Sequence, residues 1–362
     1  MPVTTPELPK KRINTPAQVL FASLVGTAVE FFDFYIYATA AVLVFPHLFF
    51  PKSDPATATL ASLATFAVAF FARPIGSALF GHFGDRIGRK RTLVLALSTM
   101  GLSTFLIGAL PGYSAIGIAA PVLLALCRFG QGIGLGGEWG GAVLLAVENA
   151  PPRKRALYGM FPQLGAPIGF ALSGGIFLLL SRWLTEKQFL GWGWRLPFLA
   201  SAALVLLGLY VRLSITETPV FEEARKRLHT ESVPIVAVFR HHARQVVAGI
   251  LVCMATFVLF YLMIVFTLDW GTTELHYSRN TFLIYLLIGT APFALMIPVA
   301  AWIAERSRRK TMIVVSALIA VFGLALAPLF TSNALVMLLV GLSLMGLTYG
   351  PLGTVVSEMF PT

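Results

Sequence analysis

The chain alternates long apolar stretches with short segments rich in charge, proline and glycine. Ten stretches, each of about 20 residues or more, are long enough to cross ~30 Å of hydrocarbon. They lie at residues 19–44, 57–80, 92–110, 117–147, 156–180, 195–213, 246–268, 281–303, 311–330 and 334–357. Because a bilayer offers no water to the backbone, each stretch is predicted to be helical.

Composition agrees with an all-α polytopic membrane protein. Hydrophobic residues make up 57% of the 362 residues and charged residues only 12%, about half the charged share of soluble domains. A soluble fold of this length would need more polar residues to cover its core. Both cysteines, Cys127 and Cys253, fall within apolar stretches, where neither a disulfide framework nor a metal site is expected.

The positions of Lys and Arg predict an orientation, because basic residues gather in cytoplasmic loops. With the N-terminus in the cytoplasm, twenty of the 27 Lys and Arg residues lie on that side and five on the other. The net charge of +11 is therefore attributed to loops, and no nucleic-acid partner is expected.

The longest polar connection, residues 214–245, divides six stretches from four. The predicted parts are a six-helix half at 1–213, the cytoplasmic connection at 214–245, and a second half at 246–362. Internal similarity supports this division. At an offset of 210, Trp139-Gly140 matches Tyr349-Gly350 and Glu148 matches Glu358.

A charged hairpin joins the second and third stretches, and a weaker copy at 304–310 joins the eighth and ninth. The first hairpin resembles the loop between helices 2 and 3 of major facilitator superfamily transporters. The matching positions are Gly81, Asp85, Arg86, Gly88, Arg89 and Lys90. The resemblance implies two pseudo-symmetric helical halves around a central cavity, with ten of the expected twelve helices present. The chain is then either a natural truncation or a fragment.

Ionisable residues inside the apolar stretches are candidates for function, because unpaired charges in hydrocarbon are costly. Glu30, Asp33 and Tyr37 share one face of the first helix. Arg73 lies in the second stretch. Arg128, Gln131 and Glu138 form a polar face in the fourth. One interpretation is a substrate cavity with proton coupling; the other is a static ion-pair network that locks the helices.

The sugar-porter branch of this superfamily resembles the first arrangement, with an Asp in helix 1 opposite an Arg in helix 4. Asp33 and Arg128 occupy the matching places, and the resemblance implies that Asp33 alternates between an arginine partner and a proton. Glu30 is an additional acid, so either carboxylate could carry the proton.

At the predicted cytoplasmic ends, Glu148 and Glu358 resemble the paired acids that close an inner gate with hairpin arginines, including Arg306 and Arg309. Solvated helix-end charges are the alternative. The glycines of the fourth stretch predict close helix packing. In the fifth stretch, residues 165–169 partly resemble the Gly/Pro motif of drug antiporters, and a packing kink is the alternative.

Several strings together resemble the bacterial metabolite:proton symporter family. They occupy residues 30–37, 73–76, 136–141, 194–198 and 217–221. The resemblance implies a monomer in the bacterial inner membrane that takes up an organic acid or zwitterion with protons and needs no cofactor. A proton-driven exporter and a non-transporting receptor are the alternatives. No enzyme is expected, because the histidines show neither metal-ligand spacing nor a hydrolytic triad.

Overall fold

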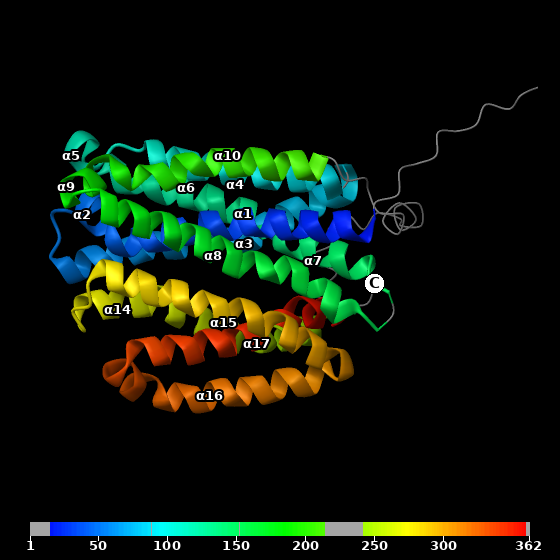
Figure 1. Ribbon diagram of the computed structural model, residues 1–362. Coiled ribbons are helices and arrows are strands. Elements are labelled where there is room, and N and C mark those ends of the chain that lie inside the picture. The colour runs from blue at the N-terminus through cyan, green and yellow to red at the C-terminus, as the bar shows by residue number, and fades with distance from the viewer. Residues whose placement is uncertain (1–14, 88, 152, 214–241, 360–362) are drawn as a thin grey trace, which may run out of the picture.

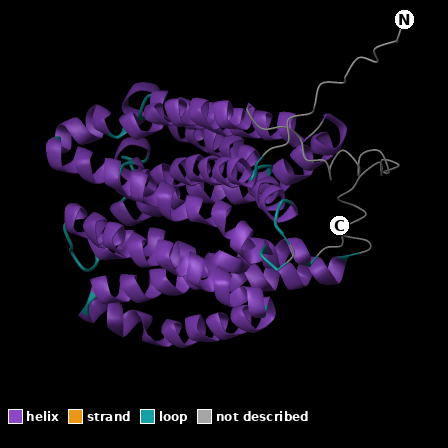
Figure 2. Ribbon diagram, turned by 45° about the vertical axis from the view of Figure 1, so that its right-hand side comes forward, coloured by secondary structure: helices purple, strands orange, loops and turns teal. Residues whose placement is uncertain are grey.

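The computed structural model describes residues 15–87, 89–151, 153–213 and 242–359; the side chains of residues 84–90 lie outside this description. Within these ranges every regular element is a helix (Figures 1 and 2). The ten predicted helical spans are confirmed. They are α1 (Pro16–Leu43), α3 (Pro55–Ile87), α4 (Arg89–Ala109), α6 (Ala119–Gly136) with α7 (Trp139–Glu148), α8 (Arg155–Trp183), α10 (Arg195–Leu213), α13 (Ala243–Tyr261) with the π-helical turn η2 (Leu262–Phe266) and α14 (Thr267–Thr273), α15 (Arg279–Arg306), α16 (Arg308–Ser332) and α17 (Ala334–Glu358).

Local sequence signals fix where several helices begin. Thr15 caps α1 in a capping box with Gln18, and Pro16 supplies the preset φ of the first turn. Ser307 and Asn333 accept backbone N–H groups at the starts of α16 and α17. These side chains satisfy backbone donors that helix geometry leaves without partners.

The helices run alternately up and down, so the bundle has two distinct ends (Figure 1). At one end α7 leads into α8, α15 leads into α16, and α17 stops. We call it the basic end because the described turns there carry Arg153, Lys154, Arg155 and 306–310. The opposite end holds the short elements α2 (Phe45–Phe49), α5 (Tyr113–Ile116), α9 (Glu186–Gln188) and the π-helical η1 (Phe189–Gly193).

Helices α1 to α10 pack mainly on one another, as do α13 to α17. The two groups meet chiefly where α8 lies along α15 and α17, green against yellow and red in Figure 1. Of the predicted connection 214–245, residues 214–241 lie outside the described part of the chain, and α13 begins at Ala243.

The glycines of α6 allow close packing on two neighbouring helices. A Cβ on Gly132 would lie 2.6 Å from the Ala69 carbonyl oxygen of α3, and one on Gly134 would lie 2.7 Å from the Ala96 carbonyl oxygen of α4. The fourth stretch differs from prediction in one respect: it is broken at Gly137 and Glu138 between α6 and α7. Apolar length alone does not reveal this break.

Candidate functional site

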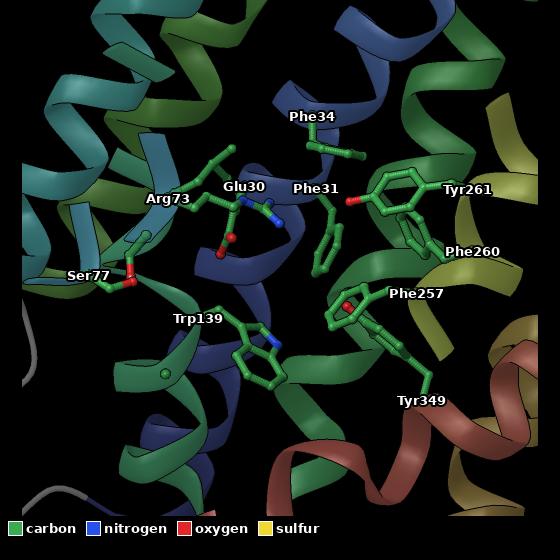
Figure 3. A pocket seen from close by; sticks show the side chains of 13 residues that line it. Glu30, Phe31, Phe34, Arg73, Ser77, Trp139, Phe257, Phe260, Tyr261 and Tyr349 are labelled. Atoms are coloured by element: carbon green, nitrogen blue, oxygen red, sulfur yellow. The ribbon is translucent and has the colours of Figure 1, made fainter. Parts of the chain in front are cut away.

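A cavity of about 240 Å³ lies between the two groups of helices (Figure 3). Its walls come from α1, α3, α6 and α7 on one side and from α13 and α17 on the other. The lining residues are Glu30, Phe31, Phe34, Arg73, Ser77, Leu135, Gly136, Trp139, Gly140, Phe257, Phe260, Tyr261 and Tyr349. The cavity therefore depends on residues that are more than 300 positions apart in the chain, such as Glu30 and Tyr349.

Glu30 and Arg73 are the two charged residues of this lining. Glu30 sits at the midpoint of α1 and is 2% exposed, and its buried Oε2 has no hydrogen-bond partner in the described part of the chain. The Arg73 guanidinium lies 5.4 Å from the ring centre of Phe34, and its Nε also lacks a partner. Within the described residues, no basic nitrogen lies within 4.0 Å of the Glu30 carboxylate. The cavity thus holds two opposite charges that are not paired with each other.

Aromatic side chains supply most of the remaining wall. Phe31 contacts Tyr349 edge to face at 6.1 Å between ring centres, and Phe260 contacts Tyr261 at 5.1 Å. The Tyr261 hydroxyl points toward the side of the cavity that carries Arg73 (Figure 3). Trp139 is fixed by a 3.2 Å hydrogen bond from its indole N–H to Gln163. These contacts, between α1 and α17, within α13, and between α7 and α8, hold the aromatic wall of the cavity in place.

Asp33 is completely buried outside this lining, one turn along α1 from Glu30. Its two carboxylate oxygens accept hydrogen bonds from Ser201 Oγ at 2.5 Å and from Thr104 Oγ1 at 2.9 Å. In this conformation Asp33 does not pair directly with Arg128. No ion pair of Asp33 occurs among the described residues, because hydroxyls from α4 and α10 occupy both oxygens.

Arg128 instead donates to the Gln131 side-chain oxygen and to the Phe66 carbonyl oxygen, the latter at 3.3 Å. Its guanidinium lies 4.1 Å from the centre of the Tyr37 ring. Gln131 in turn donates to Thr104 Oγ1 at 2.8 Å. Arg128 and Asp33 are therefore connected through Gln131 and Thr104 rather than by contact.

Tyr37 donates to, or accepts from, Thr65 Oγ1 at 2.8 Å and does not line the cavity. Glu138 lies at the break between α6 and α7, where it forms a buried ion pair with Arg212. Arg212 is one of the twenty basic residues assigned to the cytoplasmic side, and its side chain is 8% exposed and packs inside the bundle. Glu138 and Gln131 are absent from the cavity lining as well.

At the basic end, the first hairpin is described only in part. Gly81 is exposed; Gly88 and the side chains of Asp85, Arg86, Arg89 and Lys90 lie outside the described residues. The second hairpin is fully described. Arg308 Nε lies 2.9 Å from the Glu358 carboxylate, and Arg155 Nη1 lies 4.0 Å from it. Glu358 thus pairs with Arg308, a hairpin arginine that was not among those predicted.

The two arginines predicted from that hairpin have other surroundings. Arg306 lies over the Trp302 ring at 4.7 Å, and Arg309 is exposed. Glu148, the other predicted gate acid, is half-buried at the end of α7.

Glu305 is a gate candidate that the residue patterns had not singled out. Its Oε1 accepts from the backbone N–H groups of Ala156 at 2.6 Å and Leu157 at 3.0 Å. These groups open α8, so a carboxylate from α15 caps a helix of the other group, where a negative charge is favourable. The offset of 220 residues between the hairpins, which aligns Glu305 with Asp85, was a signal that could have identified it.

Among the described residues, no three His, Cys, Asp or Glu side chains gather where they could hold a metal ion. The chemistry available in the cavity is therefore that of two charged groups, aromatic faces and a few hydroxyls. Such a lining can bind and orient a small polar molecule, and its one acid, Glu30, can bind or release a proton.

Comparisons with known proteins agree with this arrangement. The sequence model of the Major Facilitator Superfamily matches residues 23–362. The inner membrane metabolite transport protein YhjE of Escherichia coli K12 is 58% identical over 360 residues, which cover 97% of this chain and 82% of that protein. The shikimate transporter of the same organism is 40% identical over 87% of this chain and 73% of its own length. The proline/betaine transporter of Salmonella typhimurium is 33% identical over 95% and 72%.

Solved structures with the same fold include the xylose transporter XylE of E. coli in a partially occluded, inward-open conformation. The match has a TM-score of 0.74 and covers 96% of this chain and 85% of that one. The sequence identity is 18%, so this likeness concerns the fold.

Proposed function

We propose that this chain, which belongs to the Major Facilitator Superfamily, takes up a small polar or anionic metabolite together with protons. The chain is a multi-pass inner-membrane metabolite transporter and not an enzyme. Proton symport in this superfamily needs no cofactor. The proposed features are the proton as the coupling ion, uptake as the direction of transport, and the residues responsible for coupling and for substrate binding.

The observation that carries the proposal is the cavity between the two groups of helices. It contains an unpaired carboxylate, Glu30, and an arginine, Arg73, at a depth where such groups are costly unless they serve a ligand or an ion. Relatives named as shikimate and proline/betaine transporters have substrates that carry a carboxylate. A guanidinium recognises a carboxylate through two parallel hydrogen bonds. Arg73 is therefore our candidate for substrate binding.

Asp33 is our first candidate for the proton carrier. Its two hydrogen bonds come from hydroxyl groups, which donate to an ionised carboxylate and accept from a protonated one. The site can thus gain or lose a proton without losing its neighbours. Gln131 and Thr104 connect Asp33 to Arg128, so a movement of α6 would change the hydrogen bonds around the Asp33 carboxylate. Glu30, which faces the cavity, is the second candidate.

The basic end is proposed to face the cytoplasm, together with the N-terminus. Twenty of the 27 Lys and Arg residues are assigned to that side, as expected for cytoplasmic loops. We assign the inner gate to the two hairpins and to the acids Glu148 and Glu358. Glu305 belongs to the same gate, because its contact with α8 crosses between the two groups of helices.

The test begins with thermal stabilisation of the purified protein by a panel of organic acids and zwitterions, because a ligand of the folded state raises apparent stability by mass action. Each stabilising compound is then added to the medium outside proteoliposomes that have an inward proton gradient. We expect accumulation against a concentration gradient, and we expect a protonophore to abolish it. Accumulation that persists without any ion gradient would overturn the proposal of proton coupling.

A further inference from the structure

Four acidic or basic groups lie in or beside the cavity wall, and they differ in whether they form an ion pair. Glu138 and Arg212 form an ion pair with each other. Among the described residues Glu30 and Arg73 form none, and both line the same cavity, where Glu30 Oε2 and Arg73 Nε lack a hydrogen-bond partner. Glu30 is 98% buried, so water offers little compensation for its charge. Among the described residues, the acid and the base of this group that form no ion pair are therefore the two that line the cavity.

The surfaces between these two groups are aromatic. Trp139, Phe257 and Tyr349 line the cavity together with Glu30, whereas the Tyr261 hydroxyl points toward the side that carries Arg73 (Figure 3). Ring faces attract cations, and ammonium groups without N–H donors are held in this way by aromatic cages. A carboxylate close to such rings adds to the attraction for a positive group. The Glu30 side of the cavity is thus suited to a cation, while Arg73 is suited to an anion.

We infer that the cavity binds a small zwitterion, with its carboxylate on Arg73 and its ammonium group between Glu30 and the aromatic wall. This inference rests on the proposed function, since it names the substrate class of the same cavity. A simple organic anion would leave Glu30 facing a second negative group. A simple cation would leave Arg73 without an anion. A zwitterion of zero net charge satisfies both groups and leaves the net charge of the cavity unchanged.

Binding of matched probes tests the inference on the purified full chain in detergent micelles. The probes are glycine betaine, tert-butylacetate and choline. In tert-butylacetate an uncharged carbon replaces the quaternary nitrogen of glycine betaine, and the carboxylate is kept. Choline keeps the ammonium group but lacks the carboxylate. Proline serves as a second zwitterion, with N–H donors. Affinity is measured by calorimetry and by intrinsic tryptophan fluorescence, to which Trp139 of the cavity lining contributes as one of six tryptophans. We expect at least one zwitterion to bind at least tenfold more tightly than tert-butylacetate and choline.

Two variants locate the binding. Glu30→Gln should weaken binding of the zwitterion at least tenfold and leave binding of tert-butylacetate unchanged or stronger, because only the ammonium group needs the carboxylate. Glu274→Gln removes an exposed carboxylate at the opposite end of the bundle and should change neither. The unfolding temperature of each variant shows whether it is folded.

The outcomes separate this inference from the proposed function. Failure of both zwitterions to bind, or equal binding of glycine betaine and tert-butylacetate, overturns the inference; proton-driven uptake of an organic acid would then leave the proposed function intact. Conversely, a zwitterion that binds through Glu30 but accumulates without a proton gradient supports the inference and removes proton coupling.

Discussion

Arg212 in the last turn of α10 forms an ion pair with Glu138, which lies 74 positions earlier at the break between α6 and α7. Both side chains are buried, with 8% and 0% exposed. Arg212 Nη1 also donates to the Leu93 carbonyl oxygen of α4 at 3.1 Å, and Nη2 lies 2.5 Å from the Cβ position that a side chain at Gly26 of α1 would take. One guanidinium therefore holds four helices together near the basic end.

Replacing Arg212 by Met should strongly destabilise the protein, because it leaves the Glu138 carboxylate buried without a counter-charge. Losing one partner of a buried ion pair costs about 3–5 kcal/mol. Unfolding in mixed micelles, followed during titration with a denaturing detergent, measures the change in the free energy of unfolding. The double variant Glu138→Gln/Arg212→Met should be more stable than Arg212→Met alone, since no unpaired charge remains.

The matched control is Glu186→Gln, which breaks the exposed ion pair with Arg279 at the opposite end. Exposed pairs contribute about 0–1 kcal/mol, so a small change is expected. A double variant at least as unstable as the sum of the two single changes would contradict the account of Glu138 and Arg212.

The sequence predicted the ten spans because hydropathy over about 20 residues records the thickness of the bilayer directly. It also identified Glu138, because a carboxylate inside an apolar stretch is conspicuous. It missed the partner, because Arg212 lies at the very end of an apolar stretch, where an arginine cannot be distinguished by sequence from a loop residue. Whether such an arginine turns inward depends on the space beside Gly26 and on the neighbouring helices, and this is a property of the packed bundle.

The hydrogen-bond partners of Asp33 could not be predicted from the sequence for the same reason. Ser201 and Thr104 are single hydroxyl residues within apolar helices, a common and unremarkable pattern. Only the packing of α10 and α4 against α1 brings the hydroxyls of Ser201 and Thr104 to the Asp33 carboxylate. The resemblance to sugar porters suggested an arginine partner instead, because it gives the positions of the two residues but not their rotamers or the conformation of the transporter.

We predict that Asp33→Asn abolishes accumulation driven by a proton gradient but largely preserves exchange of substrate between pre-loaded vesicles and the medium. Exchange requires the substrate-loaded carrier to reorient but no net movement of protons. The substitution keeps the size of the side chain, and Asn can still accept one hydroxyl hydrogen bond. Measurement of both activities in the same proteoliposome preparation separates coupling from folding.

Ser201→Ala is the companion variant, because it removes one neighbour of Asp33 and keeps the carboxylate. We expect proton-driven accumulation to continue, with a shifted dependence on pH. Full accumulation by Asp33→Asn would transfer the proposed role to Glu30.

Glu305→Gln should loosen the contact between α15 and the start of α8. A carboxylate at a helix N-terminus contributes about 1 kcal/mol, and this amount changes the ratio of two conformations about fivefold. Thr354 reports the change, because it is fully buried in α17 and its hydroxyl lies at the Cβ position of Gly159 on α8. In a background with Cys127→Ala and Cys253→Ala, a Thr354→Cys thiol should react about fivefold faster after Glu305→Gln.

Glu274→Gln in the same reporter background removes a distant exposed carboxylate and should leave the labelling rate unchanged. An unchanged rate after Glu305→Gln would mean that this contact does not bias the position of the two helix groups.

The last prediction concerns Gly165 and Gly175, two glycines of α8 with opposite surroundings. A Cβ on Gly165 would overlap Thr27 Oγ1 and lie 2.7 Å from the Ala28 backbone nitrogen of α1, whereas a Cβ on Gly175 would meet no atom within 4 Å. Gly165→Ala should therefore destabilise the protein by about 1–3 kcal/mol through overpacking. Gly175→Ala should be neutral or stabilise it by up to about 1 kcal/mol, because alanine favours the helix. Thermal unfolding of both variants in one detergent makes the comparison. Equal effects of the two variants would contradict the account of overpacking between Gly165 and α1.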